Sequence, residues 1–278
     1  MSDGYRKKYI DLHLHSTYSD GTLSVKEIVE YASTKKLTAI SLTDHDCIIG
    51  YHEIKEVAEK IGLEIIPGVE ISSMYENTDV HVLGYYFDPE NKDLRQKMDE
   101  IRLIRMDRAR RIVDRLNSKN ILLRFDRVLQ FARGFSIGRP HIAAALMAEE
   151  YASTYSEAFD KYLGNETEFY IPIQKLSPKE AINLIKSAGG LAVLAHPYVF
   201  DDETMAERLL GEGFDGIEVF YPKQSINTVR HFRQMCQKYN LLETGGSDCH
   251  GSYYGDVNIG AAHVPYSVID QMTLKLRS

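Results

Sequence analysis

Short apolar runs alternate with amphipathic helical patterns in the first ninety residues of this sequence and again beyond residue 177. Strands are predicted at 9–12, 37–42, 63–66, 191–194, 216–220 and 241–244. Helices are predicted between them at 24–35, 52–61, 178–187, 203–212 and 226–239. Parallel strands require crossover connections of this kind, and such crossovers are most often helices. The pattern therefore predicts an α/β fold whose sheet is mainly parallel.

The alternation stops between residues 91 and 175, where only helices are expected. These helices are predicted at 93–119, 127–132, 140–150 and 156–162. The first is rich in arginine, at positions Arg102, Arg105, Arg108, Arg110, Arg111 and Arg115. Because aspartates interleave with them, the pattern is typical of a solvated, ion-paired face, with a polyanion-binding stripe as the alternative. We interpret 91–175 as an inserted helical subdomain of a barrel domain formed by 1–90 and 176–278.

Composition excludes several classes of protein. The 278 residues are 44% hydrophobic and 26% charged, as in an ordinary globular protein. A net charge of -7 argues against binding of long duplex nucleic acid by overall electrostatics. Three cysteines are too few for a disulfide framework, so a reducing, cytoplasmic environment is expected. No apolar stretch approaches the roughly 18 residues that would span a bilayer, so no membrane role is expected.

Histidines and carboxylates gather near the ends of the predicted strands. Asp11, His13 and His15 alternate with leucines and so share one face of an extended segment, with Asp20 following. Four further groups are Asp44 to Asp46 around His45, Glu70 with His81, His196, and Asp248 with His250. Each alone is compatible with a core histidine bonded to a backbone carbonyl. Five such groups at the active-site edge of one sheet predict a polynuclear metal site.

The donor types restrict the metal and the reaction. Several imidazoles with carboxylates, and no paired cysteines, favour Zn, Mn or Fe. Divalent ions about 3.5 to 4 Å apart suit the hydrolysis of phosphate esters. We hypothesise in-line attack by a metal-bound hydroxide, without a side-chain nucleophile. Asp11, Asp44 and Asp46 are the catalytic candidates, expected to accept the second ring N–H of ligating histidines.

Together these motifs resemble the PHP family, the polymerase and histidinol phosphatase superfamily of metal-dependent phosphoesterases. The matching segments are DLHLH from Asp11, TDH from Thr43, GVE from Gly68, His81, AHP from Ala195 and SDCH from Ser247. The resemblance covers nearly the whole chain. It implies a distorted (β/α)7 TIM-like barrel, one strand short of the usual eight, and two to three divalent metal ions.

The resemblance also implies a ligand set for each ion. The first ion would be bound by His13, His15, Glu70 and Asp248. The second would share Glu70 and add His81 and His196. The third would be bound by Asp20, His45 and His250.

Within the family, the chain looks like the branch that acts on nucleotides, namely 3',5'-nucleoside bisphosphate phosphatases and 5'-to-3' exonucleases on short RNA. Asp20 in place of a histidine, the GVEIS run and the GRPH motif at 138–141 are the shared features. Arg139 and His141, near a helix N-terminus, are expected to grip a non-reacting phosphate, with Arg139 pairing a nearby carboxylate as the alternative. Ser16 and Thr17 are expected either to donate to a phosphate or to cap the loop of Asp20.

Three other functions stay open from the residues alone. A histidinol-phosphate phosphatase would use the same metals with an acidic recognition pocket. A non-catalytic, metal-stabilised binding module would be expected to lack several ligands, and this chain lacks none. An amidohydrolase often uses a carboxylated lysine, and no lysine of this sequence can be assigned to that role. The expected partner is a small phosphorylated substrate, a nucleotide or short oligonucleotide.

Overall fold

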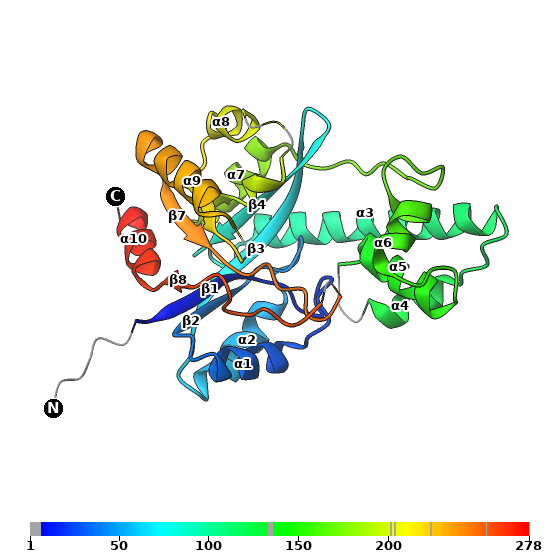
Figure 1. The fold of residues 1–278 in the computed structure, drawn as a ribbon, viewed down its shortest axis with the longest axis horizontal. Helices are drawn as coiled ribbons and strands as arrows, with labels where there is room; N and C mark the ends of the chain where they lie inside the picture. Colours follow the sequence, from blue (N-terminus) through cyan, green and yellow to red (C-terminus); the bar gives the residue numbers. More distant parts are fainter. Residues whose placement is uncertain are drawn as a thin grey trace.

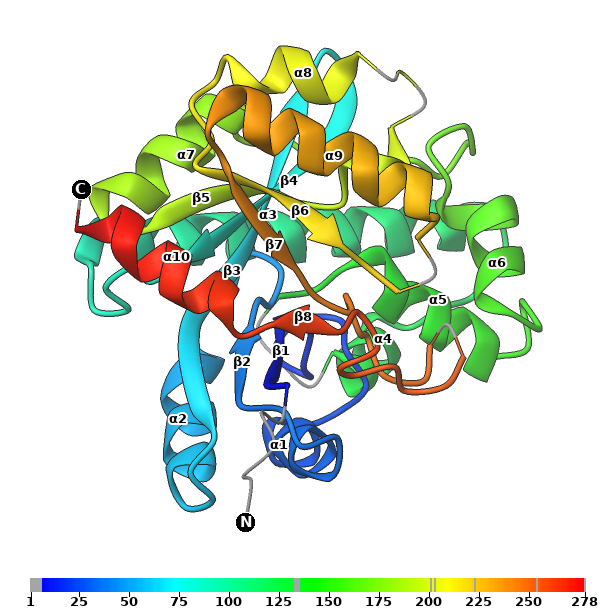
Figure 2. The same cartoon turned by 60° about the vertical axis from the view of Figure 1, so that its left-hand side comes forward.

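The computed structural model describes residues 7–132, 136–200, 202, 204–222, 224–253 and 255–277. One sheet of eight strands forms its centre, in the order β7-β6-β5-β4-β3-β2-β1-β8 (Figure 1). The strands are β1 (Tyr9–Leu14), β2 (Ala39–Leu42), β3 (Glu64–Tyr75), β4 (Thr78–Tyr85), β5 (Leu191–Leu194), β6 (Gly216–Phe220), β7 (Leu242–Gly245) and β8 (Val264–Pro265). Around their outside lie α1 (Val25–Thr34), α2 (Gly50–Glu59), α7 (Pro178–Ser187), α8 (Met205–Leu210), α9 (Ile226–Tyr239) and α10 (Ser267–Leu276) (Figure 2).

The sheet curls until the segment after β7 meets β1. The N–H of His15 donates to the carbonyl of Cys249 at 3.0 Å, in a parallel bridge between Leu14 and Cys249. Gly246 permits this approach, because a Cβ there would lie 2.4 Å from the backbone nitrogen of His13. The predicted distorted TIM-like barrel is therefore confirmed. Its distortion lies in β4, which runs antiparallel to both β3 and β5.

Four features of the barrel were not predicted from the sequence. Strand β3 does not stop at residue 66 but continues through Pro67 and Gly68, because β4 pairs with it from Gly68 to Tyr75. Strand β4 itself, strand β8, which is antiparallel to β1, and helix α10 were also missed. The extension of β3 corrects the expected position of two site residues. Glu70 and His81 lie inside β3 and β4, not beyond the ends of strands.

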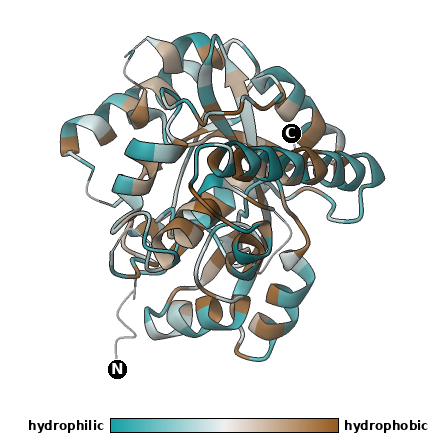
Figure 3. Cartoon of the chain, turned by 90° about the vertical axis from the view of Figure 1, so that its right-hand side faces the viewer, coloured by the Kyte–Doolittle hydropathy of each residue, from teal (hydrophilic) through white to brown (hydrophobic). Residues whose placement is uncertain are grey.

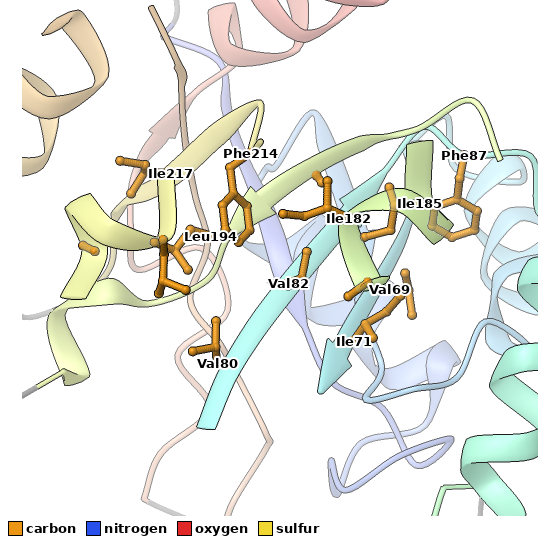
Figure 4. Packing of buried hydrophobic residues seen from close by; sticks show 14 of the residues in the cluster. Val69, Ile71, Val80, Val82, Phe87, Ile182, Ile185, Leu194, Phe214 and Ile217 are labelled. Carbon is orange, nitrogen blue, oxygen red and sulfur yellow. The ribbon is translucent and has the colours of Figure 1, made fainter. Parts of the chain in front are cut away.

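Alternation along β3 and β4 separates the core from the site. Val69 and Ile71, with Val80 and Val82, belong to the apolar cluster that packs against α7 (Figure 4). Successive side chains of a strand point to opposite faces, so Glu70 and His81 face the barrel interior. The amphipathic spacing of α7, with Ala181, Ile182 and Ile185 buried, provides the other half of this packing.

The helices between β4 and α7 pack around an apolar cluster of their own, beyond one side of the barrel (Figure 1). They are α3 (Lys92–Asn117), α4 (Phe125–Phe131), α5 (Arg139–Ala148), α6 (Tyr155–Ala158) and the π-helical turn η1 (Phe159–Leu163). Helix α3 serves both parts, since Leu94 and Met98 belong to the barrel cluster whereas Ile112 and Leu116 belong to the helical one. We propose 91–175 as the boundaries of the insertion.

Hydrophilic and hydrophobic residues alternate around the helices (Figure 3). This amphipathic pattern is typical of helices that pack against the protein on one side and face solvent on the other. Among the described residues, none of the helices has the length and apolarity that crossing a bilayer requires.

Candidate metal centre

The carboxylate of Glu70 lies at the centre of a cluster of imidazoles inside the barrel mouth. Its two oxygens are 2.8 to 3.2 Å from ring nitrogens of His13, His15, His45, His81 and His196. Glu70 is 1% exposed. A buried carboxylate among imidazoles is stabilised only by their protons or by cations that they share. The chain thus brings five histidines from four separate segments onto one acidic group.

Two further carboxylates complete the cluster. Asp248 Oδ1 lies 3.3 Å from His13 Nε2 and 3.1 Å from His15 Nε2. Asp20 approaches His250 Nε2 at 3.5 Å and His45 Nε2 at 3.9 Å. All nine side chains predicted as metal ligands therefore lie in one cluster.

The donor atoms form three groups, within each of which all atoms lie within 4.8 Å of one another. The groups are His13, His15, Glu70 and Asp248; His15, Asp20, His45 and His250; and His45, Glu70 and His81. The first has the same members as the set expected for the first ion. The second contains the set expected for the third ion, with His15 added. His196 is outside these groups, although its Nε2 is 3.0 Å from Glu70.

The cluster contains buried polar atoms that make no hydrogen bond among the described residues. They are Nδ1 of His15, His45 and His196, and Oδ1 of Asp20 and Asp248. Leaving such atoms without partners costs about 1 to 3 kcal/mol each. Imidazole nitrogens and carboxylate oxygens are the donors that borderline divalent cations prefer. The residues present therefore fit bound divalent metal ions.

Charge in the cluster favours ionised carboxylates. Burial would raise the pKa of Glu70 and of Asp248, but the surrounding imidazoles hold both well below their ordinary values. Burial lowers the pKa of His45 to about 3 despite Glu70 and Asp20. For His15, burial would lower the pKa, yet the adjacent carboxylates of Asp248 and Glu70 raise it to about 10. Ionised carboxylates and deprotonated imidazoles are the forms that bind metals, so metal binding must displace protons here.

Backbone strain also concentrates at this mouth. Asp46, His196 and Asp248 adopt positive φ angles of 50°, 29° and 50°. For residues with a side chain this conformation costs about 1 to 3 kcal/mol, and it persists where the surrounding structure enforces it. These positions aim side chains into the mouth from just beyond β2, β5 and β7.

The three aspartates predicted to be catalytic brace loops instead of orienting histidine rings. Asp11 accepts backbone N–H groups of Ser247 at 2.8 Å and Gly260 at 2.7 Å. Asp44 is bonded by the Ser16 and Ser19 hydroxyls, and Asp46 by Arg105 and by the N–H of Ser72. Asp11 also accepts the backbone N–H of His13 at 3.3 Å. Among the described hydrogen bonds of these three aspartates, however, none comes from an imidazole ring, contrary to the expectation. The rigid loops that they support hold the ligand candidates in place.

The residue that orients a histidine ring is Glu218, which the sequence analysis missed. Its Oε1 lies 2.9 Å from Nδ1 of His13. Glu218 belongs to no recognised motif, but it is an acidic residue in the middle of the apolar run GIEVF of β6. An acidic residue inside a buried strand was therefore the available signal.

The four residues predicted to bind phosphate have different surroundings. Ser16 donates its hydroxyl to Asp44 at 2.7 Å, and Thr17 donates its backbone N–H to Leu23. His141 is 1% exposed, and its Nδ1 accepts the N–H of Gly138 at 2.9 Å, which caps α5. Arg139 alone of the four lines a pocket, where it donates to the carbonyl of Leu163 and to Asn165 Oδ1.

That pocket, of about 190 Å³, lies between the histidine cluster and the helical insertion. Asp20, His45 and His81 form its wall on the barrel side. The rest of the lining includes four basic residues, Arg105, Arg108, Arg139 and Lys175, together with the carboxylates of Asp46 and Asp79. A larger cleft of about 750 Å³ opens on the other side of the cluster, past His196, Tyr221 and Asp248. The cluster thus lies between a small basic pocket and an open cleft.

The basic pocket corrects the interpretation of the arginines of α3. Arg105 is largely buried and paired with Asp46, and Arg108 donates to the carbonyl of Ile171 at 2.7 Å. Burial and the neighbouring Arg139 lower the pKa of Arg108 to about 10. The predicted solvated, ion-paired face is present at the exposed pair Arg111 and Asp107. Arg105 and Arg108, in contrast, face the site.

Comparison with known proteins agrees with this geometry. Residues 11–175 match the sequence model of the PHP domain family. The chain belongs to the PHP family. It is 32% identical over 257 residues to the 3',5'-nucleoside bisphosphate phosphatase of Chromobacterium violaceum, covering 90% of each chain. It is also 32% identical to the 5'-3' exoribonuclease Rnm of Salmonella typhimurium, covering 90% of this chain and 88% of that one.

The fold comparison points the same way. A solved structure from Bifidobacterium adolescentis, named as a candidate metal-dependent phosphoesterase, has a TM-score of 0.87 and 30% identity, with 96% of each chain covered. This PHP protein is therefore a metal-dependent phosphoesterase, a hydrolase.

Proposed function

We propose that this PHP protein hydrolyses phosphate from 3',5'-bisphosphate nucleotides, or nucleotides from short 5'-phosphorylated oligonucleotides. The observation that carries the proposal is the pocket of four basic residues directly beside the histidine cluster. A substrate with two anionic groups can present one to the cluster and the other to the pocket. The names of the two curated relatives support this substrate class.

The proposed cofactors are two to three divalent ions, Mn, Zn or Fe, held by the nine ligand candidates. Such ions would neutralise phosphoryl oxygens and acidify a water molecule. The side chains of the pocket would orient the substrate. Arg108, Arg139 and Lys175 would hold the second phosphate by charge-assisted hydrogen bonds. Arg105 is held by Asp46 and Ser72, and Asp46 balances its charge, so we assign the phosphate contacts to the other three basic residues.

The same pocket argues against histidinol phosphate as the substrate. The amine of that substrate is cationic, and like charges at close range are unfavourable in a partly buried site. The acidic side chains in this part of the lining are already paired, Asp46 with Arg105 and Asp79 with Lys175 at 2.7 Å. A binding module without catalysis would not need the complete ligand set that this chain retains.

A panel of substrates tests the proposal, with release of phosphate measured for the monoesters and release of mononucleotides measured for the RNA. Metal-free protein, prepared by dialysis against a chelator, would be assayed with added Mn, Zn, Fe or Mg on a 3',5'-bisphosphate nucleotide, 5'-phosphorylated short RNA and histidinol phosphate. We expect no turnover without metal and the highest kcat/KM on the bisphosphate or the RNA. Activity confined to histidinol phosphate would overturn the substrate class, and turnover in full without metal would overturn the mechanism.

Arg108→Met tests the second-phosphate pocket. Loss of a charge-assisted hydrogen bond costs about 1.5 to 3 kcal/mol, so we expect KM for the bisphosphate to rise by about 10- to 150-fold. For the matching 3'-monophosphate nucleotide, which has no second phosphate, KM should stay within about threefold. Steady-state kinetics on both substrates measure the difference.

Arg111→Met is the matched control, because Arg111 lies on the same helix but is exposed and 3.8 Å from Asp107. It should leave both KM values unchanged. An equal rise of KM on both substrates in Arg108→Met would mean that Arg108 does not recognise the second phosphate.

A further inference from the structure

Glu218 is a buried carboxylate in the middle of β6 that lies outside the proposed ligand set. It is 0% exposed. Its neighbours in the strand, Ile217 and Val219, belong to the apolar cluster outside the barrel, so Glu218 points to the interior. A carboxylate in such a place is costly unless donors satisfy its oxygens. The role of Glu218 therefore follows from the groups that donate hydrogen bonds to its two oxygens.

Each oxygen of Glu218 has one donor, and the two donors belong to different ligand candidates. Oε1 lies 2.9 Å from Nδ1 of His13, on β1. Oε2 accepts the backbone N–H of His196, just after β5, at 2.9 Å. The two imidazole rings stack with centroids 6.0 Å apart. One carboxylate therefore ties together two segments that are far apart in the sequence.

The first bond fixes which nitrogen of His13 faces the cluster. An ionised carboxylate only accepts hydrogen bonds, so Nδ1 of His13 must carry the proton. In the neutral ring Nε2 then has the lone pair, and Nε2 is the atom that lies 3.2 Å from Glu70 and 3.3 Å from Asp248. A ligating histidine is commonly held in this way by a carboxylate behind it.

The second bond fixes the backbone of His196. This residue has a φ of 29°, which is unfavourable for a residue with a side chain. The hydrogen bond from its N–H to Glu218 helps to hold that conformation. The imidazole is thereby directed at Glu70, with Nε2 at 3.0 Å from Oε1.

We infer that Glu218 is the positioning residue of the metal centre. Through one carboxylate it sets the tautomer of His13 and the backbone of His196, and so places a ligand candidate on each oxygen of Glu70. The inference rests on the proposed metal centre. It goes beyond the proposed ligand set because two of the proposed ions would depend on Glu218, although Glu218 would bind neither of them.

Glu218→Gln is the test variant. Glutamine has nearly the same volume but offers one acceptor and one donor, whereas both partners of Glu218 donate. The glutamine NH2 group must therefore face either the N–H of His196, which cannot rearrange, or Nδ1 of His13, which must then give up its proton. We expect divalent metal affinity, measured by chelator competition with Zn or Mn alone, to fall by about 10- to 100-fold. Metal content after dialysis should fall for more than one ion per chain.

Thr244→Val is the matched control. Thr244 is buried on β7, and its Cα is paired with that of Glu218. Its hydroxyl donates only to the carbonyl of Ile217, at 3.4 Å. This variant changes a polar group in the same layer without touching a ligand candidate, so its metal affinity should match that of the wild type.

Two measurements separate positioning from a merely structural role. Nitrogen NMR of the metal-free protein at alkaline pH should show His13 protonated at Nδ1 in the wild type and a mixture of tautomers in Glu218→Gln. Circular dichroism should show the same fold in both. Wild-type metal affinity in a folded Glu218→Gln, or an Nε2-protonated His13 in the wild type, would overturn the inference.

If Glu218→Gln does not fold, Glu218→Asp takes its place. Aspartate keeps the charge, but it is one methylene shorter and cannot reach both donors. Weaker metal binding in a folded Glu218→Asp supports the inference, and wild-type metal binding overturns it. If the wild type binds no divalent ion, the proposed function fails, and the tautomer of His13 still decides the role of Glu218.

Discussion

Glu70→Gln should remove catalysis almost completely while leaving the fold intact. The Glu70 carboxylate lies within 3.2 Å of five imidazoles and belongs to two of the three donor groups. Glutamine keeps the shape but loses the negative charge that at least two cations would share. Metal ions contribute several kcal/mol to the stabilisation of charge in the transition state. We expect kcat/KM to fall on the order of 10³-fold, with metal content per chain reduced.

Glu64→Gln is the control for this substitution. Glu64 is at the first residue of the same strand, away from the mouth, and accepts the hydroxyl of Tyr266 at 2.6 Å. An amide oxygen can accept that bond equally well, so activity and metal content should be unchanged. Phosphate release and elemental analysis measure both quantities. Full metal content and activity in Glu70→Gln would show that the cluster is not the catalytic centre.

The sequence predicted the barrel well because its local signals agree with its tertiary structure. Ser24 and Glu27 form the capping box that was expected to open α1. The apolar run of β2 ends at residue 42, as expected, and delivers Asp44 and His45 to the mouth. Such positions depend on neighbours within a few residues, and periodicity detects them.

What the sequence could not predict depends on residues far apart in the chain. Pro67 and Gly68 are local signals for the end of a strand, but pairing with β4 overrides them and keeps β3 extended past Glu70. Glu218 orients His13 from 205 positions away. Arg105 reads as one charge among many on a polar helix, and only the docking of α3 against the barrel brings it to Asp46. Periodicity contains no information about such contacts.

Arg105→Met should destabilise the protein strongly. Arg105 and Asp46 form a buried ion pair, with the Arg105 side chain 14% and the Asp46 side chain 0% exposed. The substitution leaves Asp46 as a buried charge without its partner. Breaking such a pair from one side typically costs about 3 to 5 kcal/mol. We expect the urea midpoint of unfolding to fall accordingly, with an unchanged slope if the unfolding stays cooperative.

Two companion variants show whether the buried charge is the cause. Arg95→Met removes an arginine from the same helix, but its pair with Glu90 is more than half exposed on both sides, so the loss should be at most about 1 kcal/mol. Adding Asp46→Asn to Arg105→Met should recover part of the lost stability, because the unpaired charge is gone. If Arg105→Met costs no more than Arg95→Met, the pair does not secure the insertion to the barrel. If the double variant loses as much unfolding free energy as the two single variants lose together, the cost comes from lost packing and not from the unpaired carboxylate of Asp46.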